Sequence, residues 1–431
     1  MSENQLHDFS VGSLNVHVVP STTYKTNTLL LHMRSALSKD TVTKRALLPF
    51  VLQNGTEKYP SRQDIRHELD DLYGATLNVE VSKKGENHLM TFKMDVANEK
   101  FLTDSRPLLE KAVELLASVV LHPKEDNGSF DKSIVEGEKR TLKQKLASVY
   151  DDKMRYANMR LTEEMCEDEP FSLFVHGDKD DIPSIDEKSL YEYYKQALEN
   201  DQLDLYIVGD VKEDDMKNLI EKNFKALFES ERREQMVNKT THKHVGTSRE
   251  IIEEQDIQQG KLHIGYRTHT TYDSDDYFAL QLFNGVFGGF SHSKLFINVR
   301  EKASLAYYAA SRVETHKGLI VVMSGIESNK YDDATKIIFE QMEDMKKGEF
   351  TDEDLEQTKA VLKNQLLETV DVPRGIIEMD YHNKISSKNR PFSEWMEKIE
   401  EVKKEDIVRV AEKIQLDTVY FLKGKEEGEN E

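Results

Sequence analysis

The sequence predicts an α+β protein built from two homologous halves, each a mainly antiparallel sheet covered by helices. Runs of β-branched and apolar residues of strand length are interspersed with long amphipathic helical patterns. The same order of patterns occurs twice, in a register that places Arg34 on Arg267 and Gly55 on Gly288. Hairpin patterns among the helices favour antiparallel sheets with helices layered on one face.

Local signals set the elements of the first half. Asn54-Gly55 forms a stop signal after a helical pattern, Ser61 begins the next helix, and residues 84–87 form the turn of a hairpin. In chain order, the expected elements are strands 14–20 and 26–34, helices 43–53 and 61–74, a hairpin over 75–96, helices 106–121, 134–148 and 189–199, strand 203–211 and helix 214–229.

The second half repeats this order after a polar stretch. Residues 261–289 follow the pattern strand, turn, helix and glycine stop, and residues 293–326 follow the pattern helix then hairpin. Residues 229–250 are the most polar stretch and show little periodicity, which is typical of a linker. The sequence therefore predicts an N-terminal domain at 1–228, a linker at 229–250 and a C-terminal domain at 251–431.

Composition excludes several classes of partner. The chain has 431 residues, with 59 Lys and Arg against 80 Asp and Glu, a formal net charge of -21. Such a surface does not favour nucleic acid, whereas it would attract basic substrates. A single cysteine, Cys166, rules out an internal disulfide framework. No signal-peptide pattern or membrane-spanning run is found, so we expect a cytoplasmic protein with no membrane partner.

The usual catalytic motifs are missing from the sequence. No two histidines lie four residues apart, and H-E-x-x-H does not occur. Cys166 is flanked by acidic residues, which disfavour a thiolate. The glycines of residues 285–290 lack the spacing of a dinucleotide fingerprint. The residues by themselves therefore offer no obvious place for catalysis.

The segment LFNGVFGGFSHSKLFINVREKASLAYY, residues 282–308, resembles the second-half signature of the pitrilysin/insulinase (inverzincin) metallopeptidases. It is most similar to the processing-peptidase-like branch, in which a helix ending in Asn-Gly and a glycine turn precede R-E-K-x-x-L-A-Y. Ser304 occupies a position where the family usually has glycine. The resemblance covers nearly the whole chain, and it implies a metallopeptidase-like clamshell of two such halves.

The resemblance also implies a zinc motif, H-x-x-E-H, just before the Gly-Thr pair at 55–56. Here Ala46 and Phe50 replace the two histidines, Pro49 replaces the general-base glutamate, and Lys145 aligns with the third ligand. Alanine and phenylalanine offer no lone pair, and an ammonium group repels a cation. We therefore expect no metal and no cofactor in this chain, as in members of the family that are considered inactive. Proline should end or bend the helix.

Part of the family's machinery is nevertheless retained. In active relatives an arginine and a tyrosine of the second half face the zinc, and Arg300 and Tyr307 match them. A guanidinium and a phenol can donate hydrogen bonds to a carbonyl that gains negative charge. The alternatives are that Arg300 pairs with a surface carboxylate and that Tyr307 is a core aromatic residue.

Three further substrate-binding positions follow from the resemblance. Gly288 and Gly289 resemble a glycine-rich loop implicated in substrate recognition, although glycines also simply stop helices and permit positive φ. The strand around Asn78 corresponds to an edge strand to which substrates add by β-augmentation.

The matching pair of Arg34 and Arg267 is interpreted as two arginines at solvated strand ends.

Two functions remain open after these observations. The first is a non-catalytic subunit that pairs with a zinc-motif-bearing paralogue and binds and positions peptide substrates, so that zinc is expected only in the partner. The alternative is a stand-alone peptide-binding or regulatory pseudoenzyme. In either case the chain should not be an enzyme on its own, and the sequence leaves open whether it forms a homodimer.

Overall fold

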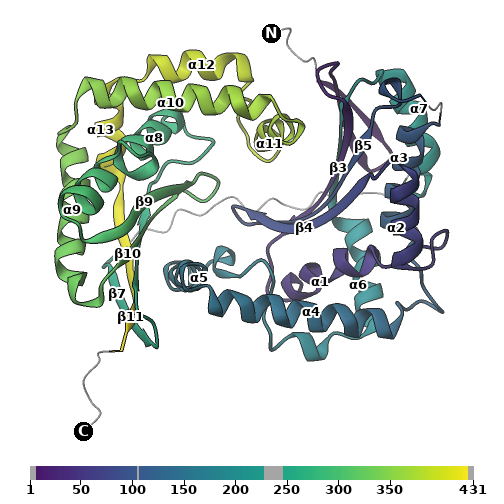
Figure 1. The fold of residues 1–431 in the computed structure, drawn as a ribbon, viewed down its shortest axis with the longest axis horizontal. Helices are drawn as coiled ribbons and strands as arrows, with labels where there is room; N and C mark the ends of the chain where they lie inside the picture. The colour runs from purple at the N-terminus through teal and green to yellow at the C-terminus, as the bar shows by residue number, and fades with distance from the viewer. Residues whose placement is uncertain (1–5, 104–105, 228–245, 426–431) are drawn as a thin grey trace. The chain divides into compact units, whose positions relative to one another are not determined.

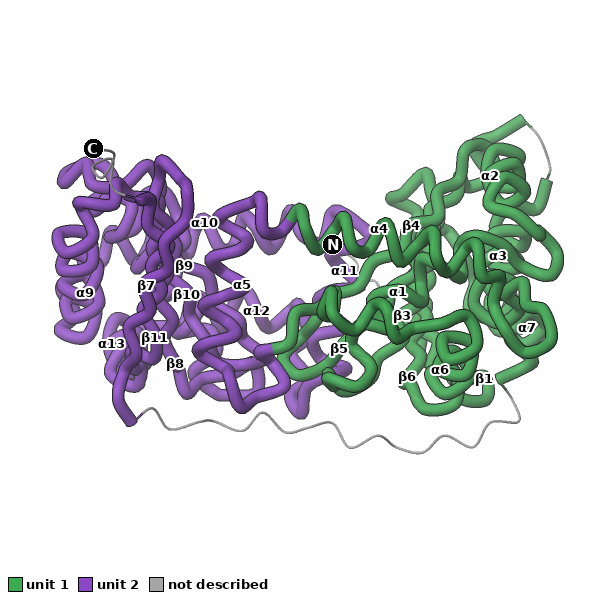
Figure 2. The backbone as a smooth tube through the Cα atoms, turned by 90° about the horizontal axis from the view of Figure 1, so that it is seen from below, with its two compact units in different colours: residues 1–148, 173–238 green, residues 149–172, 239–431 purple. Residues whose placement is uncertain are grey.

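The computed structural model describes residues 6–103, 106–227 and 246–425 (Figure 1). The chain forms two compact units, which Figure 2 shows in separate colours. Unit 1 comprises residues 1–148 and 173–238, and unit 2 comprises residues 149–172 and 239–431. Most of the predicted linker, 229–250, lies outside the described residues, and its last two residues already begin a strand.

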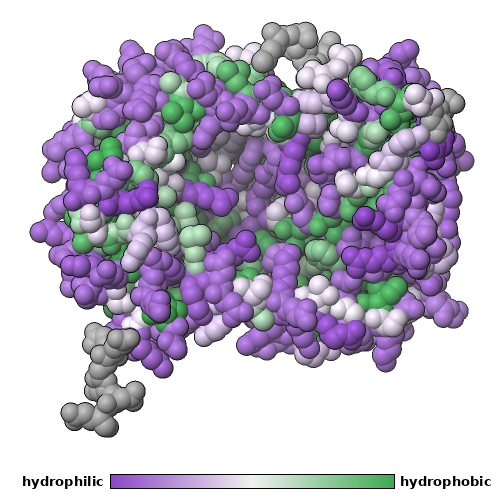
Figure 3. Space-filling view, viewed as in Figure 1, coloured by the Kyte–Doolittle hydropathy of each residue, from purple (hydrophilic) through white to green (hydrophobic). Residues whose placement is uncertain are grey.

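The face drawn in Figure 3 is mainly hydrophilic, with apolar residues in small groups. None of the helices in the described part of the chain has an apolar stretch of membrane-spanning length.

Unit 1 contains a six-stranded sheet in the order β1-β2-β6-β3-β5-β4. The pairing of β2 with β6 is parallel, and the other pairings are antiparallel. The predicted hairpin turn is confirmed, with Gly85 at φ +53° between β4 and β5. The strands are β1 (His7–Val11), β2 (Leu14–Pro20), β3 (Thr26–Ala36), β4 (Thr76–Lys84), β5 (Asn87–Ala97) and β6 (Gln202–Gly209).

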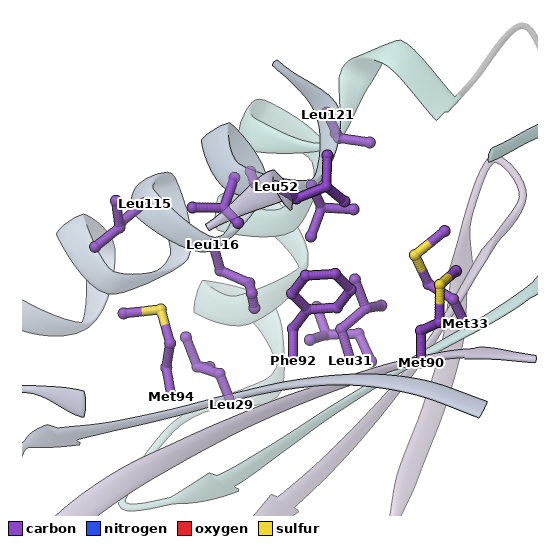
Figure 4. Packing of buried hydrophobic residues seen from close by; sticks show 14 of the residues in the cluster. Leu29, Leu31, Met33, Leu52, Met90, Phe92, Met94, Leu115, Leu116 and Leu121 are labelled. Atoms are coloured by element: carbon purple, nitrogen blue, oxygen red, sulfur yellow. The ribbon is translucent and has the colours of Figure 1, made fainter. Parts of the chain in front are cut away.

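Helices cover one face of this sheet and enclose the core of unit 1. Figure 4 shows apolar side chains of the neighbouring strands β3 and β5, including Leu31 and Phe92, pointing towards leucines of the helices. Leu31, Phe92, Leu52 and Leu116 are all at most 1% exposed. The helices are α1 (Val42–Leu52), α2 (Arg62–Asp71), α3 (Leu108–Leu121), α4 (Lys132–Asp151), α6 (Glu187–Asn200) and α7 (Glu213–Asn223).

Unit 2 contains a five-stranded sheet in the order β7-β11-β8-β10-β9. Two π-helical turns, η5 (Gly285–Gly289) and η6 (Phe296–Lys302), lie between α8 (Tyr277–Asn284) and β9. The strands are β7 (Arg249–Gln255), β8 (Gly260–Arg267), β9 (Ala306–Glu314), β10 (Leu319–Ile326) and β11 (Gln415–Gly424). The helices are α5 (Lys153–Met165), α8 (Tyr277–Asn284), α9 (Tyr331–Lys347), α10 (Asp352–Val370), α11 (Pro373–Lys384), α12 (Phe392–Glu401) and α13 (Lys404–Lys413).

The two sheets have the same internal order, which confirms the predicted fold class. The series β2-β6-β3-β5-β4 corresponds strand by strand to β7-β11-β8-β10-β9. In both series the first pairing is parallel and the rest are antiparallel. Among the described residues, unit 1 has one further strand, β1, which pairs with the outer edge of β2 and was not predicted.

The predicted continuous domains differ from the structure at residues 149–172. This segment contains α5 and belongs to unit 2, although it lies within the predicted N-terminal domain 1–228. Ala157 and Leu161 of α5 pack against Tyr420 and Leu422 of β11. A linear division of the sequence misses this arrangement because the apolar stripe of a helix does not reveal which sheet it covers.

Candidate functional site

Helix α1 carries the positions at which the resemblance implies a zinc motif. Ala46 is fully buried, and Phe50 lies one turn later on the same helix, partly buried. Pro49 is buried within α1, which continues to Leu52. The helix therefore runs past Pro49 and ends at Leu52, within one turn of the proline. Proline removes one backbone donor, but the remaining residues of this buried helix still pack against the core.

Lys145 of α4 lies beside Phe50, as the alignment with a third zinc ligand requires. Its Nζ atom is 5.3 Å from the centroid of the Phe50 ring. Asn54 connects the same two helices, because its Nδ2 atom donates to the Phe50 carbonyl oxygen at 2.6 Å and to Glu138 Oε1 at 3.0 Å. The structure thus brings Phe50 and Lys145 together, with an ammonium over an aromatic ring.

His176 is a nearby histidine that sequence analysis did not single out. Burial, with the positive charge of Lys145, lowers the pKa of its imidazole to about 4. Its Nδ1 atom is buried without a hydrogen-bond partner among the described residues. Within that same part of the chain, no three His, Cys, Asp or Glu side chains gather where they could hold a metal ion. The donor set around α1 therefore does not fit zinc.

Arg300 of unit 2 lies on the π-helical turn η6, and its side chain is exposed. Its guanidinium carbon lies 4.5 Å from the centroid of the Phe296 ring. No carboxylate within the described ranges forms an ion pair with it, so the alternative of a surface salt bridge finds no support. Single π-helical turns are frequent at functional sites.

Tyr307 follows on β9, and its side chain is 64% exposed. The alternative of a core aromatic residue is therefore wrong. In the pairing of β9 with β10, Tyr308 lies opposite Gly325 and Ala306 opposite Ile326, so Tyr307 is the extra residue of a β-bulge. A bulge bends the strand locally and can turn a side chain away from the sheet.

Ser304 lies between these two residues in a left-handed conformation, with φ +52°. This backbone conformation explains why the family usually has glycine here, because only glycine adopts it without a steric cost. Arg300, Ser304 and Tyr307 together form a connection in which a π-turn, a left-handed residue and a bulge follow one another.

The glycines of η5 have a packing role. A Cβ atom on Gly288 would lie 2.5 Å from Ser311 Oγ, and one on Gly289 would lie 2.8 Å from Asn284 Nδ2. Of the alternative interpretation, one part is confirmed, because the helical turns end at Gly289, and one part is wrong, because neither glycine has a positive φ. Gly288 is buried and Gly289 is exposed, so only Gly289 presents its backbone to solvent.

Asn78 lies on β4, an edge strand of the unit 1 sheet. It pairs on one side with Lys93 of β5, and its side chain is exposed. No other strand of the described residues covers the outer edge of β4. This geometry leaves backbone donors and acceptors open to an added strand.

The interpretation of Arg34 and Arg267 as solvated strand ends is wrong, because their side chains are buried. Arg34 donates to Gln202 Oε1. Arg267 Nη2 lies 2.6 Å from Glu169 Oε1, and Arg267 Nε lies 2.8 Å from Asp417 Oδ2. The carboxylates come from segments far away in sequence, so no local pattern indicates these pairs.

Comparisons with known proteins identify the family of this chain. Residues 47–179 match the family described as "Insulinase (Peptidase family M16)", and residues 184–362 match "Peptidase M16 inactive domain". The "Probable inactive metalloprotease YmfF" of Bacillus subtilis is 50% identical over 415 residues, which is 96% of this chain and 97% of that protein. The chain belongs to the M16 family.

Two solved structures and one more distant relative are also similar to this chain. A conserved protein from Enterococcus faecalis is 32% identical, with a TM-score of 0.91 over 98% of this chain and all of that one. An M16 inactive domain from Pseudomonas fluorescens shares the fold, with a TM-score of 0.79 at 17% identity, covering 98% of each chain. An "uncharacterized zinc protease" of Rickettsia felis is 23% identical over 75% of this chain and 77% of its own length.

The M16 signature could not reveal every residue of the site. His176 and the β-bulge at Tyr307 depend on contacts between distant segments, so no sequence signal points to them. Ser304 is the exception, because a serine at a glycine position already indicates an unusual backbone.

Proposed function

We propose that this M16 chain is a non-catalytic subunit of a heterodimeric zinc peptidase. It would bind and position a peptide for a paralogue that carries H-x-x-E-H. The observation that carries the proposal is the contrast between the units. The metal positions of unit 1 hold Ala46, Phe50 and Lys145, whereas unit 2 keeps Arg300 and Tyr307 exposed.

The roles of the two exposed residues follow from their chemistry. Zinc held by the partner would supply Lewis-acid activation of the scissile carbonyl. Arg300 and Tyr307 would donate hydrogen bonds to that carbonyl oxygen as it gains negative charge. Neither side chain buries apolar surface in a core, and a 64% exposed tyrosine in a bulge contributes little to packing.

Backbone groups would hold the peptide in register. The open edge of β4 at Asn78 can accept an extended segment by β-augmentation. At the exposed Gly289, which has no side chain, a peptide can come close to the main chain. The buried Gly288 instead lets the turn pack closely against Ser311. The net charge of -21 favours extended, basic peptides. A cytoplasmic location remains a prediction.

The second candidate is a stand-alone peptide-binding or regulatory pseudoenzyme. The β4 edge favours it, because this edge needs neither Arg300 nor Tyr307 to bind a peptide. The two candidates differ in what the variants do. If the chain is a subunit of a heterodimer, loss of Arg300 should abolish its acceleration of cleavage by the zinc subunit. Under either candidate function, peptide binding at β4 should remain.

The experiment combines this chain with a purified zinc-bearing paralogue and measures peptide cleavage. We expect the mixture to cleave faster than the zinc subunit alone. Arg300→Ala should lower kcat of the mixture by about 100-fold, as for the loss of one oxyanion donor, and Tyr307→Phe should lower it in the same direction. Arg312→Ala on β9 and Tyr150→Phe are matched controls, because both side chains are exposed.

The controls should leave the rate unchanged. If the mixture cleaves no faster than the zinc subunit, or if Arg300→Ala and Arg312→Ala behave alike, the heterodimer proposal is wrong. Retained peptide binding at β4 would then favour the stand-alone pseudoenzyme.

A further inference from the structure

The outer edge of β7 in unit 2 differs from its counterpart in unit 1. In unit 1, β1 pairs antiparallel with β2 from His7–Val18 to Val11–Leu14, and α7 packs beside both strands. His7 Nδ1 also lies 2.9 Å from Glu213 Oε2 of α7. Within the described ranges, unit 2 has no counterpart of β1 before β7 and no helix after β11. The edge of β7 is therefore uncovered there.

A cavity of about 680 Å³ lies between β7 and α9. Figures 1 and 2 both show α9 beside β7 in unit 2. The lining comes from one side of α9 and from Glu250 of β7, and Tyr331 and Phe339 are its aromatic members. Tyr331 donates to Glu250 Oε1 at 2.6 Å and stacks on Phe421 of β11 at 4.7 Å. The strand and the helix are thus joined at one end of the cavity.

The two faces of β7 have different surroundings. Glu253 accepts hydrogen bonds from Tyr156 and Tyr420, both at 2.7 Å, so this residue belongs to the face that α5 covers. Glu250, Ile252 and Glu254 alternate with it and lie on the face of α9, because successive side chains of a strand point to opposite faces. Ile252 is 51% exposed, although it is a large aliphatic residue.

The lining of the cavity carries more acidic than basic side chains. Five of the ten lining residues of the cavity are carboxylic acids and two are lysines. Two of the five acids are paired, Glu343 with Lys346 at 2.8 Å and Asp344 with Lys294 at 3.2 Å. On β7 itself, Glu254 lies 2.7 Å from Lys423. Asp332 and Glu340 are exposed and have no ion-pair partner within the described ranges.

Two copies of this chain would not pair well through β7. Antiparallel pairing about the central Ile252 would place Glu250 of one copy opposite Glu254 of the other, and like charges directly opposite are unfavourable. A strand with lysine or arginine at those positions would instead form favourable cross-strand pairs. Its central apolar residue would cover Ile252.

From this complementarity we propose that β7 and the adjoining cavity form a docking surface for an extended basic segment of another protein. The segment adds as a further strand to the sheet of unit 2 by β-augmentation. Its alternate side chains are basic, then apolar opposite Ile252, then basic again, and they extend over the acidic side of α9. This surface is independent of the proposed peptidase function, because it includes neither β4 nor Arg300 and Tyr307.

The test uses a fluorescent synthetic peptide that alternates lysine and threonine around a central valine, with the full chain. We expect binding, measured by fluorescence anisotropy, and slower amide hydrogen exchange in residues 249–255 when the peptide is present. The double variant Glu250→Lys/Glu254→Lys should bind it about tenfold or more weakly. Glu353→Lys/Glu412→Lys is the matched control, because it makes the same change of charge at exposed helical sites.

Several results would overturn the proposal. They are equal weakening in both double variants, unchanged exchange in residues 249–255, or equally tight binding of a peptide with glutamate in place of lysine. Concentration-dependent protection of residues 249–255 without peptide would show that a second copy occupies the edge. If Glu250→Lys disturbs folding through Tyr331, Ile252→Lys tests the same edge, because its side chain is half exposed.

Discussion

At the residue scale, the connection between Arg300 and Tyr307 shows how one substitution in the family pattern is tolerated. Ser304 adopts φ +52°, where a residue with a Cβ atom is strained. The residue is exposed, and the hydrogen bond that its Oγ donates to the Glu301 carbonyl oxygen is long, at 3.4 Å, so it offsets little of this cost. The strained residue follows η6, the turn that carries Arg300, and precedes the bulge that turns Tyr307 outward.

Ser304→Gly should therefore stabilise the protein by about 1 kcal/mol, because glycine relieves the left-handed strain. Urea denaturation followed by circular dichroism measures this difference. Ser291→Gly is the matched control, because Ser291 is exposed and has an ordinary φ. Equal effects of both substitutions would contradict the assignment of strain to Ser304.

A buried cluster around Glu169 makes a second prediction at this scale. Glu169 lies within ion-pair distance of Arg267 and Lys317, and all three side chains are at most 6% exposed. Burial raises the pKa of the Glu169 carboxyl, but the two cations outweigh it and hold that pKa below its usual range. Arg267 is also paired with Asp417, so two cations balance two carboxylates.

Glu169→Gln should destabilise the protein by about 3 kcal/mol, because it leaves an excess of buried positive charge. Thermal or urea unfolding measures the loss. Glu167→Gln should cost less than about 1 kcal/mol, because Glu167 pairs with Arg249 at the surface. A similar loss for both variants would show that the cluster does not stabilise unit 2.

At the element scale, the sequence predicted those features that depend on local chemistry. Helix α1, the N-cap at Ser61 and the β4–β5 turn follow from capping, periodicity and turn residues, and all three are confirmed. Strand β1 was missed, because it is short and pairs only with β2. The attachment of α5 to unit 2 and the two π-turns were also missed, because both depend on packing between distant segments.

Strand β1 has a polar anchor whose strength should depend on pH. His17 of β2 is buried, with Nδ1 2.7 Å from Asp8 Oδ1 of β1 and Nε2 3.5 Å from Asp204 Oδ1 of β6. Burial alone lowers the pKa of His17, but the hydrogen bonds and charges of Asp204 and Asp8 outweigh it and raise that pKa above 6.5. Protonated His17 therefore stabilises the folded state.

This contribution should be fully present below about pH 6.5 and should be lost as the pH rises through the raised folded pKa. Urea denaturation of wild type and His17→Gln between pH 6 and pH 9 measures it. The difference in the free energy of unfolding should shrink towards high pH. Other histidines also make stability depend on pH, such as His88 and His263, whose pKa values burial lowers to about 3. Their contributions are the same in both proteins, so they cancel in the difference. A difference that is independent of pH would contradict the account.

At the scale of the whole molecule, two copies of one architecture have diverged in what they retain. The copy in unit 1 has its metal positions filled by an apolar residue, a ring and an ammonium group. The copy in unit 2 keeps an exposed arginine and tyrosine. The family and the substituted zinc motif could be predicted from the sequence, because the motif is local. The proximity of Phe50, Lys145 and His176 could not, because it depends on the packing of α4 beside α1.

Restoring the donors should restore metal binding if this geometry is right. The quadruple variant Ala46→His, Pro49→Glu, Phe50→His and Lys145→Glu should bind zinc tightly, because it replaces the positions with ligands and a base of the inverzincin pattern. Isothermal titration with zinc measures the gain. The triple variant that keeps Lys145 is the control and should bind more weakly, because the ammonium repels the cation.

The central claim is that the wild-type chain cannot hold a catalytic metal, and elemental analysis of the purified protein tests it most directly. After incubation with zinc and removal of the excess, inductively coupled plasma mass spectrometry should find far less than one zinc per chain. The account would be contradicted if the lone chain held one zinc per molecule and hydrolysed peptides, and if a chelator removed both the zinc and the activity.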